Sequence, residues 1–386
     1  MNLRVLLVDP SLFTAPYDAE LDDGLSKIGV QTTWAARNSR RNEDGSFPFH
    51  KIRTSFYSLS DRLPRSYSRW RSSAKAIEHI FGLLKLVYLG WTSGPDVVHI
   101  QWTPFPILDA AAIWLIGARA TVVVTLHDTT PYNGERMPLL QRCGYFLPAK
   151  LANRVIVHTA PARDRLLVKG FDREKVCVVA HGALPLRGVQ PSRTERVSQS
   201  VMTFVLFGQL KPYKGVDVLI SAVAQLPEKI RNQCRFIIAG APMMDMEPIR
   251  KRIATLNVGS VVELRLHRLS EQEMADLFNE TDAFLFPYLA IDASGVYFLV
   301  KHYAKWIIAS RVGIFAEELR EGINGTLVGP AKVDELAEAI AWVVDQKPRV
   351  VEQPNLNSEW EMIAQATVRV YLGGSSEAAR DRSADA

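Results

Sequence analysis

The stretch Phe204-Val-Leu-Phe-Gly208-Gln-Leu-Lys211-Pro-Tyr-Lys214-Gly215 is the most informative part of this 386-residue chain. It begins as a short apolar run, passes through a glycine turn and leads into an amphipathic segment at 216–226. A buried apolar run followed by a turn and a helix is typical of a strand in a parallel sheet. The stretch therefore predicts an α/β fold.

Ten similar short apolar runs recur along the chain, and six of them are followed directly by Gly, Asp, His or Pro. They lie at residues 5–8, 97–100, 122–126, 155–157, 176–179, 204–207, 236–239, 261–264, 283–286 and 307–309. Because 386 residues exceed one comfortable core, and because segment 186–200 has the Ser, Arg, Gln and Pro content of a linker, we expect two domains. Each half is predicted to carry its own doubly wound parallel sheet.

The composition, with 47% hydrophobic and 23% charged residues, excludes a fibrous or largely disordered chain. The cysteines Cys143, Cys177 and Cys234 lie far apart without a CxxC spacing, which fits a reducing, cytoplasmic setting. The N-terminal run ends at Asp9 without a cleavage site, and no stretch reaches the ~18 apolar residues that a membrane span needs. The tail at 373–386 lacks apolar periodicity and is predicted to be disordered.

The turn after residue 207 has the chemistry of an anion site at the carboxyl end of a strand, where α/β sheets bind ligands. Gly208 allows close backbone approach, while Lys211 and Lys214 and the following helix N-terminus favour a diphosphate. Gln209 and Tyr213 lie in the same turn and are candidate substrate contacts. A solvated basic turn is the alternative interpretation.

A second polar segment follows the run 283–286. It contains Asp292, Ser294, Gly295 and Val296, with a helix expected to open near Val296. Backbone N–H groups there would bind a second face of the diphosphate, and Asp292 would accept hydrogen bonds from sugar hydroxyls. Asp292 and Ser294 also suit the N-cap position of that helix.

In the first half, two strand ends carry candidate residues. His127 and Asp128 follow the run 122–126, and Gln101 and Trp102 follow the run 97–100. Asp128 would orient the imidazole, serve as a general base or cap the next segment, while Gln101 and Trp102 would face an acceptor. A histidine at a strand end is also often structural, which is the role expected of His181.

The segment 62–75 holds five basic residues, two aromatic residues, Tyr67 and Trp70, and no acid. Anionic lipid headgroups would bind such a segment, and a solvated helix face is the alternative. None of the signatures of nucleic-acid-binding domains accompanies the charge, so we expect no nucleic-acid partner. The net charge of +5 agrees with an anionic partner without choosing one.

Together with Ala309-Ser-Arg-Val-Gly313, Glu317 and Glu321-Gly-Ile-Asn-Gly-Thr-Leu-Val328, the two polar segments occur in an order known from one family. The chain resembles the GT-B glycosyltransferases of the family 4 type, well over 204–344 and more weakly in the first half. The resemblance implies two facing Rossmann-like domains, an acceptor domain at 1–185 and a nucleotide-sugar domain at 201–350. It also implies a last helix within 351–372 that returns to the first domain.

The resemblance further implies transfer of a hexose from a GDP- or UDP-linked sugar with retention of configuration. His127 would lie close to the donor sugar, and Lys211 and Lys214 would stabilise the departing diphosphate. In a retaining reaction that diphosphate takes the acceptor proton; an inverting one would need His127 or Asp128 as base. No metal or other cofactor is expected, because the lysines neutralise the diphosphate.

Two positions depart from the family pattern. Gln209 stands where the family usually has arginine, so Lys211 replaces that charge. Of the family's paired glutamates only Asp292 remains, with Leu299 and Val300 where the second, a ribose contact, would fall. The departure weakens the inference of nucleotide identity.

We predict a lipid-linked oligosaccharide or polysaccharide precursor, carried on a polyprenyl diphosphate, as the acceptor in bacterial exopolysaccharide or envelope assembly. The enzyme would then be cytoplasmic and peripheral, on the inner face of the plasma membrane. A sugar-nucleotide epimerase, or a non-catalytic subunit that binds nucleotide sugars, is the alternative function.

Overall fold

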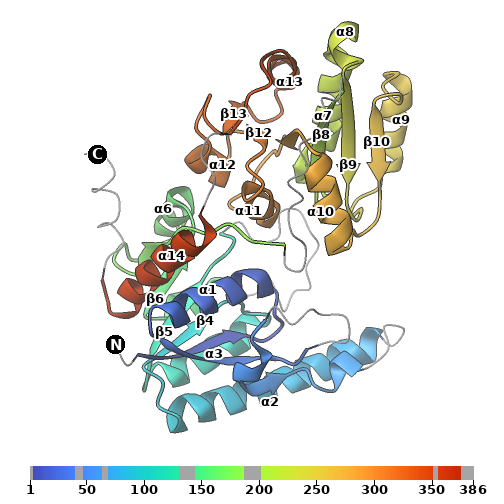
Figure 1. The fold of residues 1–386 in the computed structure, drawn as a ribbon. Helices are drawn as coiled ribbons and strands as arrows, with labels where there is room; N and C mark the ends of the chain where they lie inside the picture. The colour runs from blue at the N-terminus through green and yellow to red at the C-terminus, as the bar shows by residue number, and fades with distance from the viewer. Residues whose placement is uncertain are drawn as a thin grey trace, which may run out of the picture. The chain divides into compact units, whose positions relative to one another are not determined.

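The computed structural model describes residues 3–39, 47–62, 68–129, 144–186, 201–350 and 355–374. The chain divides into two compact units, Met1–Gly182 with Asn357–Ala386, and Ala183–Leu356. Each unit contains one parallel sheet with helices packed on it (Figure 1). The predicted linker from residue 187 onward, and the predicted disordered tail from residue 375, lie outside the described residues.

The first unit is built on a seven-stranded sheet with the order β3-β2-β1-β4-β5-β6-β7. Every neighbouring pair of its strands is parallel. The strands are β1 (Arg4–Asp9), β2 (Gln31–Arg37), β3 (Ile52–Phe56), β4 (Val97–Ile100), β5 (Thr121–Thr125), β6 (Arg154–Val157) and β7 (Val176–Val178). The central strands are buried along almost their whole length, as their β-branched sequences predict.

Helices connect these strands and cover the sheet. They are α1 (Ala15–Lys27), α2 (Ser68–Thr92), α3 (Pro106–Ile116), α5 (Leu147–Leu151) and α6 (Ala160–Val168), with short 3-10 turns η1 (Phe49–Lys51) and η2 (Ser60–Arg62). The last helix, α14 (Leu356–Tyr371), also belongs to this unit from Asn357 onward. Its Trp360 ring lies 5.3 Å from the ring of Tyr17, and the Tyr371 hydroxyl hydrogen-bonds His99 Nδ1 at 2.7 Å. The last helix is therefore held against the first sheet.

The second unit has a six-stranded parallel sheet with the order β10-β9-β8-β11-β12-β13. Its strands are β8 (Met202–Phe207), β9 (Cys234–Ala239), β10 (Val262–Arg265), β11 (Ala283–Phe286), β12 (Trp306–Ser310) and β13 (Gly325–Val328). Its helices are α7 (Val216–Gln225), α8 (Glu228–Arg231), α9 (Glu247–Thr255), α10 (Glu271–Glu280), α11 (Gly295–Lys301), α12 (Gly313–Glu318) and α13 (Val333–Gln346), with the 3-10 turn η4 (Pro212–Lys214). β8 and β11 are neighbours, so the strand order reverses between them, and ligands bind outside the carboxyl ends of strands at such a point.

The predicted α/β class with two parallel sheets is confirmed, and every predicted apolar run overlaps a strand. Three strands, β2, β3 and β13, were not predicted from the sequence. β2 and β3 mix Thr, Ser, Gln and Arg with apolar residues, and β13 contains only Gly-Thr-Leu-Val. β3 and β13 are edge strands, which need fewer apolar residues because one side has no neighbouring strand.

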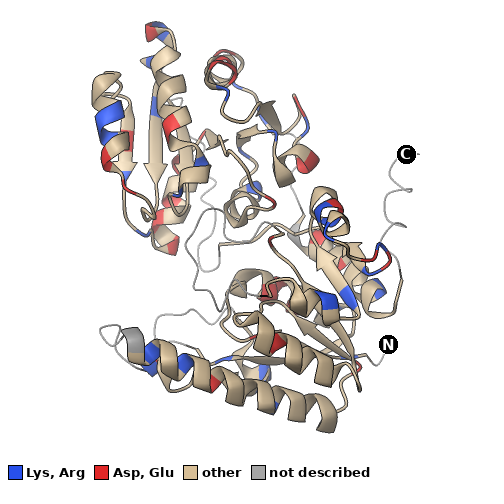
Figure 2. Cartoon of the chain, turned by 180° about the vertical axis from the view of Figure 1, so that it is seen from behind, with Lys and Arg blue, Asp and Glu red and all other residues tan. Residues whose placement is uncertain are grey.

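Among the described residues, no helix is long and apolar enough to cross a membrane. The predicted basic segment is only partly described, since residues 63–67 lie outside the described ranges. Lys and Arg gather near the start of α2 (Figure 2). Two of these cations interact within the unit: Arg71 lies 3.7 Å from the Asp61 carboxylate, and Lys75 lies 4.6 Å from the centre of the Tyr57 ring.

Candidate functional site

The turn after β8 is shaped by two glycines. Gly208 has φ of +109° and Gly215 has φ of +67°, values that side chains with a Cβ rarely adopt. A Cβ on Gly215 would lie 2.0 Å from the carbonyl oxygen of Pro287, in the loop after β11. The turn after β8 and the loop after β11 are thus in direct backbone contact, and the Leu289 amide donates to the Tyr213 carbonyl at 2.8 Å.

Lys214 is a buried lysine with 3% of its surface exposed. Its Nζ donates to the Phe207 carbonyl at 2.9 Å and lies 5.1 Å from the centre of the Tyr288 ring. Burial, and secondarily the charge of Lys211, lower the pKa of Lys214 from 10.5 to about 7. This lysine gains or loses its charge near neutral pH, and an anion beside it would favour the charged form.

The two polar segments predicted from the sequence meet beside this lysine. A Cβ on Gly208 would lie 2.6 Å from Lys214 Nζ and 2.6 Å from Val296 Cγ2. Gln209 is exposed at the turn, whereas Lys211 and Tyr213 are half-buried. The carboxyl ends of β8 and β11 therefore bring the cationic turn against the start of α11.

In the loop before α11, Asp292 and Ser294 are both buried, at 4% and 5% exposure. Ser294 is the N-cap residue of α11, and its Oγ accepts from the Tyr297 amide at 3.3 Å. The Asp292 carbonyl accepts from the Ile314 amide at 2.9 Å, which ties the loop to α12. Gly295 is exposed and has open space where a Cβ would stand.

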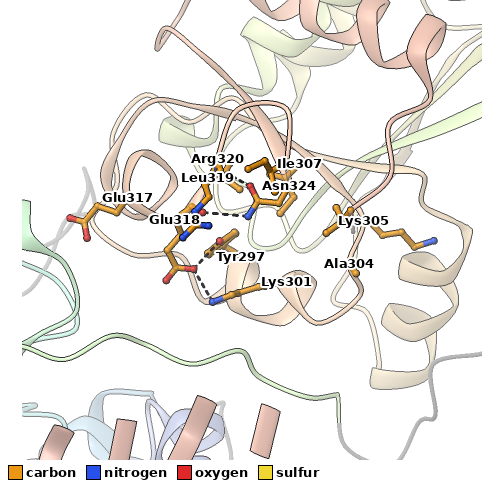
Figure 3. Close-up of a pocket in the computed structure, with 12 residues that line it drawn as sticks. Tyr297, Lys301, Ala304, Lys305, Ile307, Glu317, Glu318, Leu319, Arg320 and Asn324 are labelled. Atoms are coloured by element: carbon orange, nitrogen blue, oxygen red, sulfur yellow. Dashed lines mark hydrogen bonds and ion pairs between the residues drawn. The ribbon is translucent and has the colours of Figure 1, made fainter. Parts of the chain in front are cut away.

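Leu299 and Val300 stand where the family pattern has its second glutamate. Leu299 is half-buried and Val300 is buried, so both side chains pack within the unit. An acid reaches α11 from elsewhere: Glu318 accepts from the Tyr297 hydroxyl at 2.9 Å and pairs with Lys301 at 2.9 Å (Figure 3). These side chains line a cavity of about 410 Å³. The cavity also touches Lys305 and Ile307 at the start of β12. It therefore lies toward the amino ends of the strands, whereas Gly208 follows the carboxyl end of β8, and it is not the predicted diphosphate site.

In the first unit, His127 follows β5 and bonds to a second histidine that the sequence analysis missed. His127 Nδ1 lies 3.0 Å from His158 Nε2, and His158 Nδ1 lies 3.0 Å from the Val179 carbonyl. Because a carbonyl only accepts, His158 Nδ1 carries a proton and His158 Nε2 accepts from His127 Nδ1–H. His127 Nε2 is then unprotonated and carries a lone pair, and it has no hydrogen-bond partner among the described residues.

Burial keeps both histidines neutral. It lowers the pKa of His158 to about 4 and that of His127 well below the usual value of 6.5. The Tyr17 ring lies 5.0 Å from the His127 ring, 5.3 Å from His158 and 4.8 Å from His181. The available signal for His158 was its place directly after the apolar run 155–157, the same position that His127 has after the run 122–126.

The remaining candidates of the first unit lie at neighbouring strand ends. The structure buries Gln101 completely, with Nε2 3.4 Å from His99 Nδ1, so its side chain points inward and does not present itself to an acceptor as predicted. Trp102 is half-buried and stacks on Phe13 at 4.1 Å, and the Phe13 ring is 65% exposed. Asp128 is half-buried, and its carbonyl accepts from the Tyr145 hydroxyl at 2.8 Å.

A buried carboxyl pair at the end of β1 was also missed. Asp9 accepts from the amides of Ser11 and Thr14, each at 3.0 Å, and Thr14 Oγ1 contacts Asp18 at 3.2 Å. Burial raises the pKa of Asp9, and burial together with the Asp9 charge raises that of Asp18 well above 3.8. No His, Cys, Asp and Glu cluster of three or more within the described ranges is arranged to hold a metal ion.

Two family models match this chain. The model of Glycosyltransferase Family 4 matches residues 19–183, and that of Glycosyl transferases group 1 matches residues 193–360. The chain belongs to the family 4 glycosyltransferases. The second match contains the whole cationic turn and the loop before α11, and the first contains His127 and His158.

Curated relatives of this family 4 glycosyltransferase include the D-inositol 3-phosphate glycosyltransferases of Streptomyces scabiei and Mycobacterium ulcerans. The first is 24% identical over 316 residues, which are 76% of this chain and 68% of the relative. The second is 28% identical over 200 residues, which are 46% of this chain and 42% of the relative.

Solved structures share the GT-B fold over nearly the whole chain. Anabaena Alr3699/HepE in complex with UDP and glucose matches 100% of this chain and 99% of its own, with a TM-score of 0.63 and 17% identity. The catalytic domain of starch synthase IV from Arabidopsis thaliana, bound to ADP and acarbose, matches 96% and 99% with a TM-score of 0.66 and 11% identity.

Proposed function

We propose that this glycosyltransferase transfers a hexose from a UDP- or GDP-linked sugar to a lipid-linked oligosaccharide or polysaccharide precursor in bacterial exopolysaccharide or envelope assembly. The main support for this proposal is that Lys214 is buried beside the Gly208 turn, where a diphosphate would bind a cation that is shielded from water. Complexes of HepE with UDP and with UDP-glucose support the donor class. The lipopolysaccharide outer core galactosyltransferase WaaB, with a TM-score of 0.60 and 14% identity, supports a glycan acceptor.

The proposed donor site uses the residues that meet at the β8 and β11 ends. Lys211 and Lys214 neutralise the diphosphate, and Gly208 and Gln209 line its approach. Asp292 accepts from sugar hydroxyls, while Tyr213, Ser294, Gly295 and Val296 complete the pocket wall. On the first unit, Trp102 stacked on Phe13 offers an aromatic platform for an acceptor sugar.

The proposed reaction retains configuration. The bond between the sugar C1 and the diphosphate oxygen breaks, and the acceptor hydroxyl oxygen bonds to C1 on the same face. The hydroxyl proton passes to the departing diphosphate oxygen, so no protein base is required. Protonated Lys214 and Lys211 stabilise the negative charge that develops on that diphosphate.

We further propose that turnover needs no divalent cation, because the lysine pair supplies the charge that a metal ion supplies elsewhere. Full activity in excess chelator is the expected result. Activity that chelator abolishes and magnesium or manganese restores would contradict this part of the proposal.

The test begins with thermal shifts of the protein in a panel of UDP- and GDP-linked sugars, because a bound donor raises the melting temperature by mass action. The donor selected is then incubated, radiolabelled, with a membrane extract that supplies lipid-linked acceptors. We expect label in the lipid fraction, and loss of both shift and label when Lys211 and Lys214 are changed together to Met. Epimer formed without acceptor would indicate an epimerase, and binding without any turnover a non-catalytic subunit.

A further inference from the structure

The first unit carries an apolar surface that none of its described residues covers. It is formed by three helices, with α3 packed between α2 and α5. We call it the α2–α3–α5 face. Its outward side chains are Ile77, Ile80, Phe81, Leu84, Tyr88 and Trp91 of α2, Ile107, Leu108, Trp114 and Leu115 of α3, and Leu147 and Leu151 of α5.

On α2 the exposed apolar residues form a continuous stripe. Residues 77, 81, 84, 88 and 91 follow one another in steps of four and three, which places them on one side of the helix. The opposite side is used for the core, where His79, Leu83 and Leu86 are buried. α2 therefore has two apolar sides, although packing on the sheet requires only one.

The stripe continues onto α3. Trp91 at the end of α2 donates from Nε1 to the Leu115 carbonyl at 3.0 Å, which joins the two helices. The outward side of α3 contains only apolar residues, and Trp114 there is 68% exposed. Contiguous exposed apolar surface of this extent is uncommon in monomeric proteins and marks an interaction site.

The charges of the face have one sign. The only acids within α2, α3 and α5 are Glu78 and Asp109, and both are bonded inward. Glu78 accepts from the Leu59 and Ser60 amides at 2.7 Å each, and Asp109 contacts His79 Nε2 at 2.7 Å.

The outward charged groups are cations. Lys85 of α2 and Lys150 of α5 are exposed. Arg119, just after α3, is exposed and holds its guanidinium 5.2 Å from the centre of the Trp91 ring. The apolar face thus has a cationic rim and no outward acid on its helices. Figure 2 shows that few positions along α2 are charged.

We propose that the α2–α3–α5 face docks on an anionic lipid bilayer. Leu, Ile and Phe side chains would enter the acyl boundary, Trp and Tyr would lie at the headgroup level, and the cations would bind lipid phosphates. A symmetric contact between two copies fits less well, because it would bring the cationic rims of both copies together, and the helices of the face offer no outward acid to pair with them. The inference deepens the proposed function, on whose lipid-linked acceptor it rests, and it names the surface that brings the enzyme to that acceptor.

The test is co-sedimentation of the full chain with vesicles of phosphatidylcholine containing phosphatidylglycerol. Leu84→Glu and Trp114→Glu place a charge on the face, and each is expected to weaken binding at least about tenfold, since burying one such side chain contributes about 1.5–3 kcal/mol. Met362→Glu is the matched control, because Met362 is 61% exposed on α14, away from the three helices. The control is expected to bind as the wild type does.

A second variant removes charge and leaves every apolar side chain in place. Lys85→Ala is expected to weaken binding to the anionic vesicles about fivefold, since one cation near such a surface contributes about 1 kcal/mol, and to leave binding to pure phosphatidylcholine unchanged. Wild-type protein that stays in the supernatant, or face variants that bind like the control, would overturn the proposal. So would a dimer in sizing experiments that Trp114→Glu dissociates while vesicles bind neither protein.

The same preparations separate the two proposals. Thermal shifts with the donor sugar nucleotide are expected to be equal for wild type and all face variants, because no substitution touches the second unit. A wild type that shows the donor shift but stays in the supernatant with the vesicles pelleted counts against docking alone. A donor shift absent from a wild type that binds vesicles counts against the proposed function alone.

Discussion

Binding of a sugar diphosphate is expected to draw a proton onto Lys214. In the protein without ligand, burial holds the pKa of this lysine at about 7, far below its usual 10.5. A diphosphate beside Nζ favours the ammonium form by direct charge attraction and raises that pKa again. Binding and protonation are therefore coupled.

The size of the coupling follows from the pKa. With a pKa of about 7, Lys214 is about half neutral at pH 7 and about nine-tenths neutral at pH 8. Uptake on binding is then about 0.5 proton at pH 7, about 0.9 at pH 8 and about 0.1 at pH 6. The affinity then falls about fivefold between pH 7 and pH 8 and nearly tenfold for each further pH unit, until the pH approaches the pKa of the bound form.

The assay is isothermal titration calorimetry with UDP-glucose in buffers of different ionisation enthalpy. The observed enthalpy plotted against buffer enthalpy has a slope equal to the number of protons taken up. A nucleotide sugar is the suitable probe, because its diphosphate is fully ionised over this pH range and contributes no proton of its own.

Lys211→Met is the matched control, because it removes a neighbouring cation from the same turn and leaves the Lys214 side chain in place. It is expected to bind more weakly and still to take up a proton, with the uptake shifted to higher pH because Lys211 no longer depresses the pKa of Lys214. Lys214→Met is expected to show no uptake. A wild-type slope of zero at pH 8, or an equal slope in Lys214→Met, would refute the assignment of Lys214 as the buried diphosphate cation.

Three further predictions test other parts of the two units. Gly208→Ala is expected to abolish the thermal shift with donor, because the added Cβ would lie 2.6 Å from Lys214 Nζ; Gly259→Ala, with 3.7 Å to its nearest neighbour, is expected to keep it. Trp360→Ala is expected to cost about 3–5 kcal/mol of unfolding free energy in urea titrations, since this indole is only 2% exposed, and a loss below about 1 kcal/mol would show that α14 is loosely held. His158→Phe is expected to lower kcat at least about tenfold by freeing the orientation of the His127 ring, whereas His158→Gln, whose amide oxygen accepts the same hydrogen bond, retains more activity; equal kcat values would exclude a positioning role.

The strands could be predicted because their signal is local. A run such as Val122–Val124 must be apolar on both faces when helices cover both sides of a parallel sheet, and this leaves a mark in consecutive residues. β2 and β3 escaped prediction because strands near a sheet edge tolerate Thr, Arg and Ser. Their pairing with β1 and with each other is a non-local property that no short window of residues contains.

The residues of the candidate site also differ in whether their signal is local in the sequence. Its glycines, lysines and acidic loop were predictable, because a turn that approaches a diphosphate needs residue types with a recognisable spacing. His158 was not, because its bond to His127 joins residues 31 positions apart. The basic segment at the start of α2 suggested a membrane surface, whereas the larger apolar face depends on which side of each helix the sheet leaves outward.

The order of the amino acids alone determines the class of the fold, its two parallel sheets and the cationic turn at a strand end, since each of these is written in neighbouring residues. Folding decides the rest: that Lys214 is buried enough to lose its charge near pH 7, that His127 presents a lone pair, and that α2 and α3 keep an apolar side uncovered. Desolvation, tautomer and exposure all depend on which distant segments surround a side chain, and contacts between distant segments exist only in the folded chain.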